Sequence, residues 1–560
     1  MTPSHSTSPQ PPRTDPFRWS RADTARAFDH FAAPDHSSQR QYAHDHDIPR
    51  STLGYWLRRD NPGDADAVAA FFHSPSGAAF LRGIVLAAFV AFHQRGACGL
   101  RLIDYFLHLA QLDRFVASSR GALQPLAAHV EADLGTFDDE QRPLLAKQMA
   151  PKNIAVTADE NFHGQDPCLV AIEPVSNFIL VECYRNRRDA DTWTEAIREG
   201  VRDMPVTVVL LNSDLARGLL CCAEKGLEVP HSPDLFHGQR DLLKPLLLPL
   251  ARPIQQAEKD LEKAKRHTVK VDATLDQVQS QEAVVTIVEA VRNELGIAQR
   301  LEEAKERQGQ VVQPVRGLGD DYHPFDRKTG CPVTAEQVAE RLHQHLEQVE
   351  KVVAEAGLGE RAGAAVAKAR SWLGTLAACV AWFWMLTNKC VEELELSEEQ
   401  EQAVYESLLP GLYWEGAAGR ARTGEERQRL QQLAAQLQKV AWQAGGALAS
   451  LPETQQQQVQ RVAQECAGLF SRSSSCVEGR NGRLSLHHHG QGRLSARKLK
   501  GLTVIHNYGM KRADGTTAAE RFFGVKHPDL FSWLLERMPD LPRPAAKRSK
   551  KTSQPSLQAN

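Results

Sequence analysis

Three carboxylates stand where this sequence changes character. Asp214 directly follows the apolar, β-branched run "VTVVLLNS" (206–213), Asp159 lies in "VTADENFHG" at the end of an earlier run, and Glu478 opens a basic segment in "CVEGRNGRLS". Acids at strand ends can ligate hard cations such as Mg²⁺, which prefer oxygen ligands. Two cations on shared carboxylates can activate water or a hydroxyl and stabilise a leaving oxygen. An aspartate like Asp214 is also a common helix N-cap, and both interpretations remain open.

The segment that carries the first two acids predicts strands alternating with helices. Residues 153–162 are expected to form a strand, 168–184 two strands joined by a turn near 174–177, and 206–214 a fourth strand. Helices are expected after Asp189 or Asp191, as N-caps, and over 215–226, with Gly226 at the C-terminal end. A short extended piece and a third helix follow. This order predicts a mixed sheet flanked by helices, in a multidomain α+β protein.

The next 220 residues have another composition. Residues 251–470 are rich in Gln, Glu, Ala and Leu and predict helices, including a coiled-coil hairpin over about 251–308. Residues 317–332 are expected to form a loop. The apolar stretch 371–390 has polar flanks and Gly and Thr within it, so it predicts a buried core helix. This part of the chain is therefore expected to be all-helical.

The N-terminal part contains a pattern typical of a helix-turn-helix. Ala43, Ile48, Leu53 and Trp56 have the spacing that lets a second helix pack across the first, and Pro49 can open that helix. Asp47 replaces the usual turn glycine, and an ordinary helical hairpin is the alternative. The residues expected to contact DNA are Arg50, Ser51, Thr52, Arg58 and Arg59. Residues 66–150 predict a second helical module, which is either another DNA-binding unit or a spacer.

Charge and cysteine content restrict the partners and the compartment. The net charge of the chain is −2, yet residues 471–560 contain 17 Lys and Arg against 6 Asp and Glu. A basic C-terminal segment favours a polyanionic partner. The ten cysteines include no CxxC pair, which argues for a reducing compartment and against a structural zinc site. No apolar run reaches the length of a membrane span, and no signal peptide is expected.

Together these features resemble the DDE-type transposases of insertion sequences. Beyond the three acids, "DLFH" (234–237) fits the C/D-x-x-H signature of the hAT and Mutator-like groups, and it lies 23 residues after Asp214. The gap of 241 residues from His237 to Glu478 is far too long for one loop, and hAT-like enzymes have an all-helical insertion at that place. "VEGRNGRLS" is similar to the final-acid segment of bacterial transposases. The resemblance covers about residues 153–524.

The resemblance implies an RNase H-like core interrupted by the helical insertion. Asp159, Asp214 and Glu478 would ligate two Mg²⁺ or Mn²⁺ ions, and His237 would assist near the scissile phosphate or fix the strand–helix corner. Arg480 and Asn481 would contact DNA phosphates. Glu160 should point to the opposite face of its strand, and Asp234 is expected to be structural. The implied domains are 1–16 disordered, 17–65 helix-turn-helix, 66–150 helical, 151–250 and 471–540 RNase H-like, 251–470 insertion, and 541–560 a disordered basic tail.

The implied activity is cleavage at transposon ends and strand transfer to target DNA, in the cytoplasm at the bacterial nucleoid. Because such enzymes pair two ends, a homodimer or higher oligomer is expected, and no membrane partner. Three alternatives remain at this point: a catalytically inactive, domesticated DNA-binding protein, an RNase H-like nuclease without strand transfer, and a structural coiled-coil protein. The three acids argue against the first, the large insertion against the second, and the strand-rich middle against the third.

Overall fold

The computed structural model describes residues 21–59, 67–275, 281–491 and 494–544. The chain divides into two compact units. Unit 1 consists of Met1–Leu144, Arg483–Thr517 and Lys526–Asn560, and unit 2 of Leu145–Gly482 and Ala518–Val525. Helices and a small mixed sheet make up the described chain, so the α+β class is confirmed.

A five-stranded mixed sheet forms the centre of unit 2. Its strands are β1 (Lys152–His163), β2 (Asp166–Glu173), β3 (Phe178–Tyr184), β4 (Val206–Ser213) and β5 (His231–Pro233), in the order β3-β2-β1-β4-β5. β1, β2 and β3 pair antiparallel, whereas β1–β4 and β4–β5 pair parallel. β2 is buried on both faces, as a continuous apolar strand inside a sheet should be. All the predicted strands are present.

Two helical segments connect the strands on either side of β4. α8 (Ala190–Gly200) begins after Asp189, whose side chain accepts a hydrogen bond from the Thr192 amide, so the first predicted N-cap is correct. α9 (Arg217–Cys221) continues as the π-helical turn η3 (Cys222–Leu227). The predicted C-cap is wrong: the left-handed residue is Glu228 (φ 58°), not Gly226. Gly226 is needed for another reason, since a Cβ there would lie 1.9 Å from Oγ1 of Thr194.

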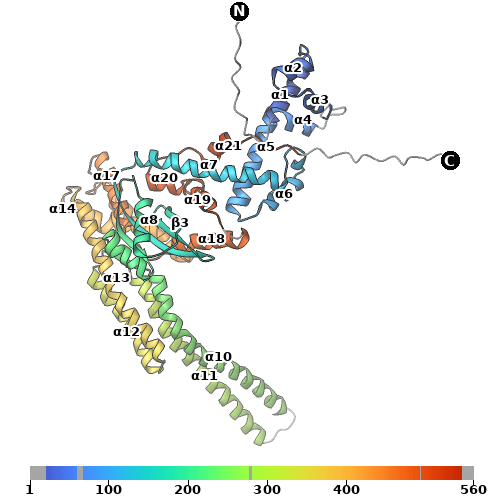
Figure 1. Ribbon diagram of the computed structural model, residues 1–560. Helices are drawn as coiled ribbons and strands as arrows, with labels where there is room; N and C mark the ends of the chain where they lie inside the picture. Colours follow the sequence, from blue (N-terminus) through green and yellow to red (C-terminus); the bar gives the residue numbers. More distant parts are fainter. Residues whose placement is uncertain (1–20, 60–66, 276–280, 492–493, 545–560) are drawn as a thin grey trace, which may run out of the picture. The chain divides into compact units, whose positions relative to one another are not determined.

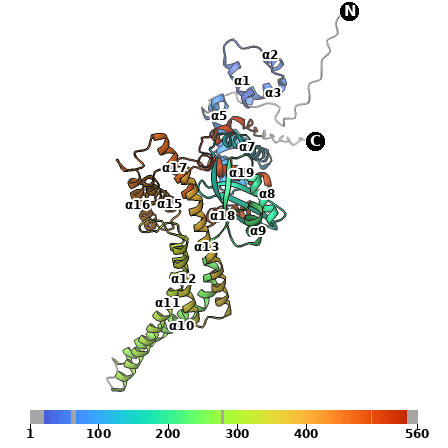
Figure 2. The same cartoon turned by 90° about the vertical axis from the view of Figure 1, so that its left-hand side faces the viewer.

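The helices that follow β5 pack around one apolar core. Residues 335–470 contribute Val349, Trp372, Phe383 and Trp414, so the apolar stretch 371–390 lies in a buried helix as predicted. The helices are α10 (Leu235–Leu275), α11 (Gln281–Asp321), α12 (Ala335–Glu355), α13 (Glu360–Glu392), α14 (Glu398–Ala403), η4 (Val404–Leu408), α15 (Leu409–Ala418), α16 (Gly424–Ala441) and α17 (Glu453–Gly468). Figures 1 and 2 show α10 and α11 as a long hairpin extending from the other helices of unit 2.

Two expected boundaries in this region are wrong. α10 already begins at Leu235 and runs without interruption into the hairpin, so the helical region has no start at residue 251. α11 extends to Asp321, which makes 317–321 helical, and the loop begins after it. Gly317 and Gly319 suggested a loop, but Gly317 lies where a Cβ would be 2.3 Å from the His345 ring, so it serves close packing.

Unit 1 contains two groups of helices. α1 (Arg21–Ala32), α2 (Gln39–Asp45) and α3 (Arg50–Arg59) enclose a small core that includes the four residues of the predicted pattern, Ala43, Ile48, Leu53 and Trp56. Asp47 between α2 and α3 has φ 50°, the conformation in which the pattern usually has glycine. The second group is α4 (Ala67–His73), α5 (Pro75–Ala88), η1 (Phe89–Arg95), α6 (Leu100–Leu109), α7 (Arg120–Ala146), α19 (Ala496–Val504), η5 (Ile505–Gly509) and α21 (Leu530–Arg537).

The C-terminal segment is divided differently from the expectation for 471–540. Residues 483–517 and 526–544 belong to unit 1. Asp138 of α7 accepts a hydrogen bond from Tyr508 (2.8 Å) of the first stretch, and Phe137 packs edge-to-face on Trp533 (5.2 Å) of the second. Residues 541–544 of the expected disordered tail are also placed: Leu541 is buried and the Pro542 carbonyl accepts from the Ala117 amide. The predictions for 1–16 and for 545–560 fall outside the described residues.

One helical stretch among the described residues, Pro75–Arg95, is long and apolar enough to cross a membrane by length and composition alone. A third of its most apolar window is buried inside the protein.

Candidate active site

Asp159 lies on the central strand β1, and Asp214 directly follows β4, the strand that pairs with β1 in parallel. The parallel register ends with the pair Thr157 of β1 and Asn212 of β4, and each aspartate is the second residue after that pair. Parallel neighbours are about 4.8 Å apart, and residues two positions apart share a face. β1 does not end at Asp159, as the sequence suggested, because residues up to His163 continue to pair with β2. The sheet therefore holds Asp159 rigidly, whereas Asp214 begins the turn into α9.

One helix packs on the face that carries Asp159. Asp159, Val170 and Glu182 are in register across β1, β2 and β3, so their side chains project from the same face. α18 (Ser475–Gln491) contacts both ends of this row: Asn481 donates to Oδ2 of Asp159 (3.1 Å), and Arg480 forms a bidentate ion pair with Glu182 (2.5 and 2.6 Å). Because Glu478 lies in the first turn of α18, these contacts fix where it points.

His237 connects Glu478 to the start of α10. Its Nε2 lies 3.5 Å from Oε1 of Glu478, and its Nδ1 lies 3.1 Å from Oδ2 of Asp234. Asp234 is buried and accepts hydrogen bonds from the amides of Phe236 (2.7 Å), His237 (3.1 Å) and Ser474 (2.8 Å), and from the Ser474 hydroxyl. It thus caps α10 and ties it to the residue before α18, the structural role expected for it.

The charges in this site are strongly coupled. Burial, followed by the neighbouring charges of Asp214 and Glu160, raises the pKa of Asp159 to about 7, although the Glu160 amide and His237 oppose the rise. The interaction with Asp234 raises the pKa of His237 against the effect of burial. Burial would raise the pKa of Asp234, but hydrogen bonds from His237 and Ser474 lower it below its usual value. The site therefore combines a carboxylate that resists ionisation with a histidine that favours protonation.

Of three neighbouring residues, Arg480 and Asn481 have other contacts than expected, and Glu160 lies where it was expected. The Arg480 side chain is only 5% exposed and is engaged by the fully buried Glu182, so it is a structural residue and not a phosphate contact. The side-chain amide of Asn481 donates to Asp159 and positions that carboxylate. Its contact in this structure therefore differs from the expected contact with DNA. Glu160 ion-pairs with Arg188, consistent with its expected position on the opposite face from Asp159.

The donor set suits a hard divalent cation. Asp159 on β1 and Asp214 directly after β4 offer carboxylate oxygens, and Asp214 uses one oxygen to accept from the Ala216 amide (2.9 Å). Ala216, not Asp214, occupies the N-cap position of α9. The buried Oδ1 of Asn481 receives no hydrogen bond from any described residue, so a polar acceptor beside Asp159 is unsatisfied. Oxygen ligands, some supplied by water, are what Mg²⁺ and Mn²⁺ require.

A second grouping of possible ligands overlaps this one. Ligand atoms of Asp234, His237 and Glu478 lie within 4.8 Å of one another. However, a carboxylate has about four lone-pair sites, and Asp234 already accepts four hydrogen bonds. A cation at Asp234 would have to displace the cap of α10. The Asp159–Asp214 pair is therefore the better cation site, with Glu478 at its edge.

The residues expected to read DNA lie on α3 of unit 1. Arg50 and Ser51 are exposed at its first turn, and Thr52 is half-buried. The side chains of Arg58 and Arg59 fall outside the described part of the chain. An exposed arginine and serine at a helix start are suited to phosphate contacts.

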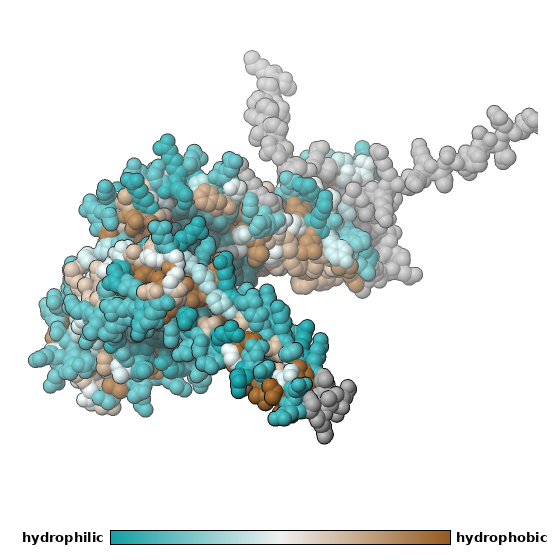
Figure 3. Space-filling model, turned by 90° about the horizontal axis from the view of Figure 1, so that it is seen from below, coloured by the Kyte–Doolittle hydropathy of each residue, from teal (hydrophilic) through white to brown (hydrophobic). Residues whose placement is uncertain are grey.

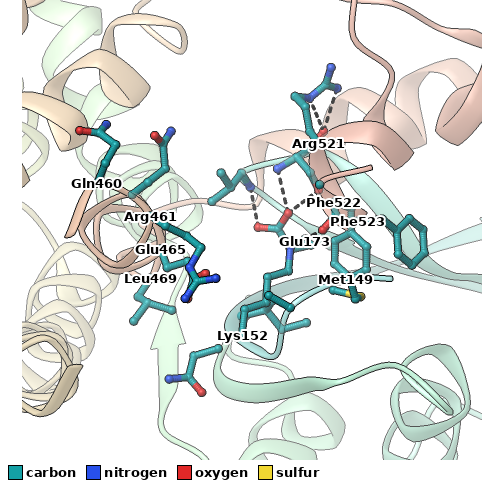
Figure 4. A pocket seen from close by; sticks show the side chains of 18 of the residues that line it. Met149, Lys152, Glu173, Gln460, Arg461, Glu465, Leu469, Arg521, Phe522 and Phe523 are labelled. Atoms are coloured by element: carbon teal, nitrogen blue, oxygen red, sulfur yellow. Dashed lines mark hydrogen bonds between the residues drawn. The ribbon is translucent and has the colours of Figure 1, made fainter. Parts of the chain in front are cut away.

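A separate cavity opens at the other end of β1. It has a volume of about 810 Å³ and is lined by the start of β1, the turn after β2, α17 and residues 521–525. Figure 4 shows Glu173 at its centre, where its carboxylate accepts from the amides of the 174–176 turn. Lys152 donates to the Phe522 carbonyl (2.5 Å) and lies 4.2 Å from that ring. Lys152 thus joins β1 to residues 518–525, and Arg521 donates to the Ser176 carbonyl (2.9 Å) and joins the same residues to the turn after β2.

Sequence reasoning missed the residues that hold the acids in place. His231 accepts or donates a 2.8 Å hydrogen bond with Ser213, immediately before Asp214, and burial lowers its pKa to about 4. No sequence pattern singles out Ser474, yet its backbone amide donates to Asp234 and so connects the start of α18 to that carboxylate. The one signal available for Asn481 is its position three residues after Glu478, which places both near one face of a helix.

Comparison with known proteins adds little to this geometry. A family model described as a family of unknown function, DUF6399, matches residues 404–550. The matched part includes Glu478 and α18 but neither Asp159 nor Asp214. No curated protein matches the chain.

Proposed function

We infer that this protein is a metal-dependent DNA transposase whose core is RNase H-like and whose N-terminal helices form a helix-turn-helix. The observation that carries the proposal is the position of Asp159 on β1 and of Asp214 directly after the parallel neighbour β4, with α18, whose first turn contains Glu478, packed on the face that carries Asp159. The sheet order β3-β2-β1-β4-β5 supports the fold assignment, because it places the first strand at the centre with the fourth strand beside it.

Asp159, Asp214 and Glu478 would hold the cations. Divalent ions bound there would supply the positive charge that makes water or a 3′-hydroxyl nucleophilic and stabilises the leaving oxygen. The protein's own contribution is positioning: Asn481 orients Asp159, the Ala216 amide orients Asp214, and His237 orients Glu478. Because the carboxylates are already held in position, no free energy is needed to order them during the reaction.

His237 has the properties of a proton-carrying group beside the reacting phosphate. It is partly exposed, and Asp234 holds its Nδ1 side, so its Nε2 side faces Glu478 and the site. Its raised pKa extends the imidazolium form to higher pH, and that form can donate a hydrogen bond or a proton to a phosphate oxygen. The same charge partly offsets the repulsion between the acids.

DNA would be recognised by unit 1. The small core of α1–α3 presents Arg50 and Ser51 at the start of α3, in the manner of a recognition helix. The basic composition of residues 471–560 would add affinity for the phosphate backbone that does not depend on sequence. The substrate we propose is a duplex carrying the end of the element that encodes the protein.

Cleavage of a labelled duplex taken from the DNA flanking the coding region tests the proposal. Wild-type protein with Mg²⁺ or Mn²⁺ is expected to nick at a defined position, and Asp214→Asn is expected to bind the duplex equally but not nick it. Glu160→Gln is the matched control, since this acid faces the other side of β1 and should leave nicking intact. Binding without nicking by the wild type would favour the non-catalytic DNA-binding alternative.

A further inference from the structure

The far half of the α10–α11 hairpin carries an apolar stripe that no described residue covers. Val284, Val288, Val291 and Leu295 of α11 are all exposed large apolar side chains, and Val269 of α10 is another, each between 41% and 69% exposed. Figure 3 shows apolar residues gathered at this end of the hairpin. We call these five residues the hairpin seam.

The seam has the spacing of a coiled coil. Its α11 members are separated by four, three and four residues, which is the a/d pattern of a heptad repeat. A different stripe of α11, which includes Ala290, Ile297 and Leu301, is buried against α10. α11 therefore has two heptad stripes, and only one of them is used within the chain.

All five seam residues lie on one face of the hairpin. Val288 and Val291 each follow a position that faces α10, and Val269 follows Thr268, which has the corresponding position on α10. In two antiparallel helices that pack together, the residue directly after a contact position points to the same side of the pair on both helices. Exposed apolar residues on one face at heptad spacing are the surface that a further helix covers.

We propose that the hairpin seam binds the seam of a second copy of this chain, with the two α11 helices antiparallel about a two-fold axis between Glu289 and Ala290. This arrangement matches every α11 member with an apolar residue: Val284 faces Leu295 of the second copy, and Val288 faces Val291. It also brings Arg292 within a helical turn of Glu289 of the second copy. In a parallel, in-register pairing each charged residue would instead lie beside the same residue of the second copy, so like charges would meet. The two helix dipoles would also be aligned.

The length of the seam indicates a weak contact. Eleven residues of helix extend about 16 Å, so the buried area falls well below that of a standard stable interface. A second copy remains the best occupant, because the self-matched seam needs no additional partner and its rim carries both signs of charge. The contact uses none of the acids of the candidate active site, so its test is independent of the cleavage assay.

Sedimentation of the full-length protein over about a hundred-fold range of concentration tests the contact. Val288→Glu with Val291→Glu is expected to weaken self-association about ten-fold or more, because it buries charges without partners. Thr286→Glu with Asn293→Glu is the matched control: it adds the same charge to the opposite face of the hairpin and should leave self-association unchanged. All four positions are exposed, so circular dichroism should report equal helicity for both variants.

Disulfide trapping tests the orientation, in a Cys331→Ser background because Cys331 is the one exposed cysteine of the described chain. A mixture of Val284→Cys and Leu295→Cys proteins should form the mixed disulfide, and neither variant alone should cross-link, since its own copies lie about 16 Å apart. A cross-link of Val284→Cys with itself would overturn the antiparallel arrangement. A monomer at all concentrations, or a charged seam variant that associates like the wild type, would overturn the contact itself.

Discussion

Replacing Asp159 by asparagine should stabilise the metal-free protein. Burial and the charge of Asp214 raise the pKa of Asp159 from 3.8 to about 7. A shift of about three units corresponds to about 4 kcal/mol of unfavourable free energy for the ionised carboxylate at pH 8. Partial exposure and relaxation reduce this, so we expect Asp159→Asn to gain about 1–3 kcal/mol in free energy of unfolding at pH 8. The same substitution should abolish activity.

The local structure can accept the asparagine. Its carboxamide oxygen can still accept from the Glu160 amide. Its NH₂ group would face the amide of Asn481, but a flip of Asn481 would offer the Oδ1 atom that now receives no hydrogen bond from a described residue. The flip moves the Asn481 NH₂ group to the buried position where Oδ1 now has no described partner. The substitution therefore removes a charge and exchanges one unpaired buried acceptor for one unpaired buried donor, which lowers the expected gain in stability.

The pH dependence gives the sign of the effect. Since the folded-state pKa of Asp159 is raised, its penalty is absent below the unfolded-state value and fully present above about pH 7. The stability difference between Asp159→Asn and wild type should therefore shrink by more than half from pH 8 to about pH 5. Denaturant unfolding in EDTA, followed by tryptophan fluorescence, measures this difference.

Addition of Mn²⁺ should reverse the order of stability at pH 8. Wild type should gain stability with increasing Mn²⁺, whereas Asp159→Asn should gain little, because a cation that binds only the folded state stabilises it by mass action. Glu160→Gln controls for the loss of a neighbouring charge and should respond to Mn²⁺ like the wild type. A destabilised Asp159→Asn, a difference that does not change with pH, or an equal response to Mn²⁺ would refute the reasoning.

Three further substitutions separate positioning, proton transfer and DNA binding. Arg480→Met should lower the free energy of unfolding by about 3–5 kcal/mol, because it leaves the buried Glu182 charge unpaired. A loss below about 1 kcal/mol in denaturant unfolding, the value of an exposed pair, would contradict the structural role of Arg480. His237→Gln should reduce nicking about 10²-fold or more while wild-type Mn²⁺ stabilisation persists; loss of both would make His237 a ligand instead. Arg50→Ala should weaken duplex binding and reduce its salt dependence by about one phosphate contact. Binding is measured at several salt concentrations, and a variant that binds like the wild type at all of them would exclude Arg50 from the DNA interface.

The sequence predicted the elements of this fold well because their signals are local. β-branched runs, the Asp189 cap and the helical composition of residues 251–308 depend on neighbours within a few residues, and the strands, the cap and a helical hairpin are present. The boundaries that failed involve tertiary contacts. The sequence predicts Gly226 at the end of a helix and Gly317 at the start of a loop, whereas close contacts with Thr194 and His345 explain why both positions are glycine.

The candidate site could be predicted only in part for the same reason. Asp159 lies inside β1 and Asp214 directly follows β4, and the parallel pairing of these two strands brings them to the same part of the sheet. Arg480 and Asn481 gave no sign in the sequence of whether they would face DNA or the sheet, because that depends on which residues of β1 and β3 lie under α18. The allocation of 483–517 to unit 1 likewise depends on the buried contacts of Asp138, which are remote in sequence.

A crystal structure of the protein soaked with Mn²⁺, with an anomalous difference map, tests the central claim most directly. The account predicts anomalous density between the carboxylates of Asp159 and Asp214, with Glu478 turned toward it and Asp234 still capping α10. Density at Asp234, His237 and Glu478 alone, or none near Asp159, would contradict it.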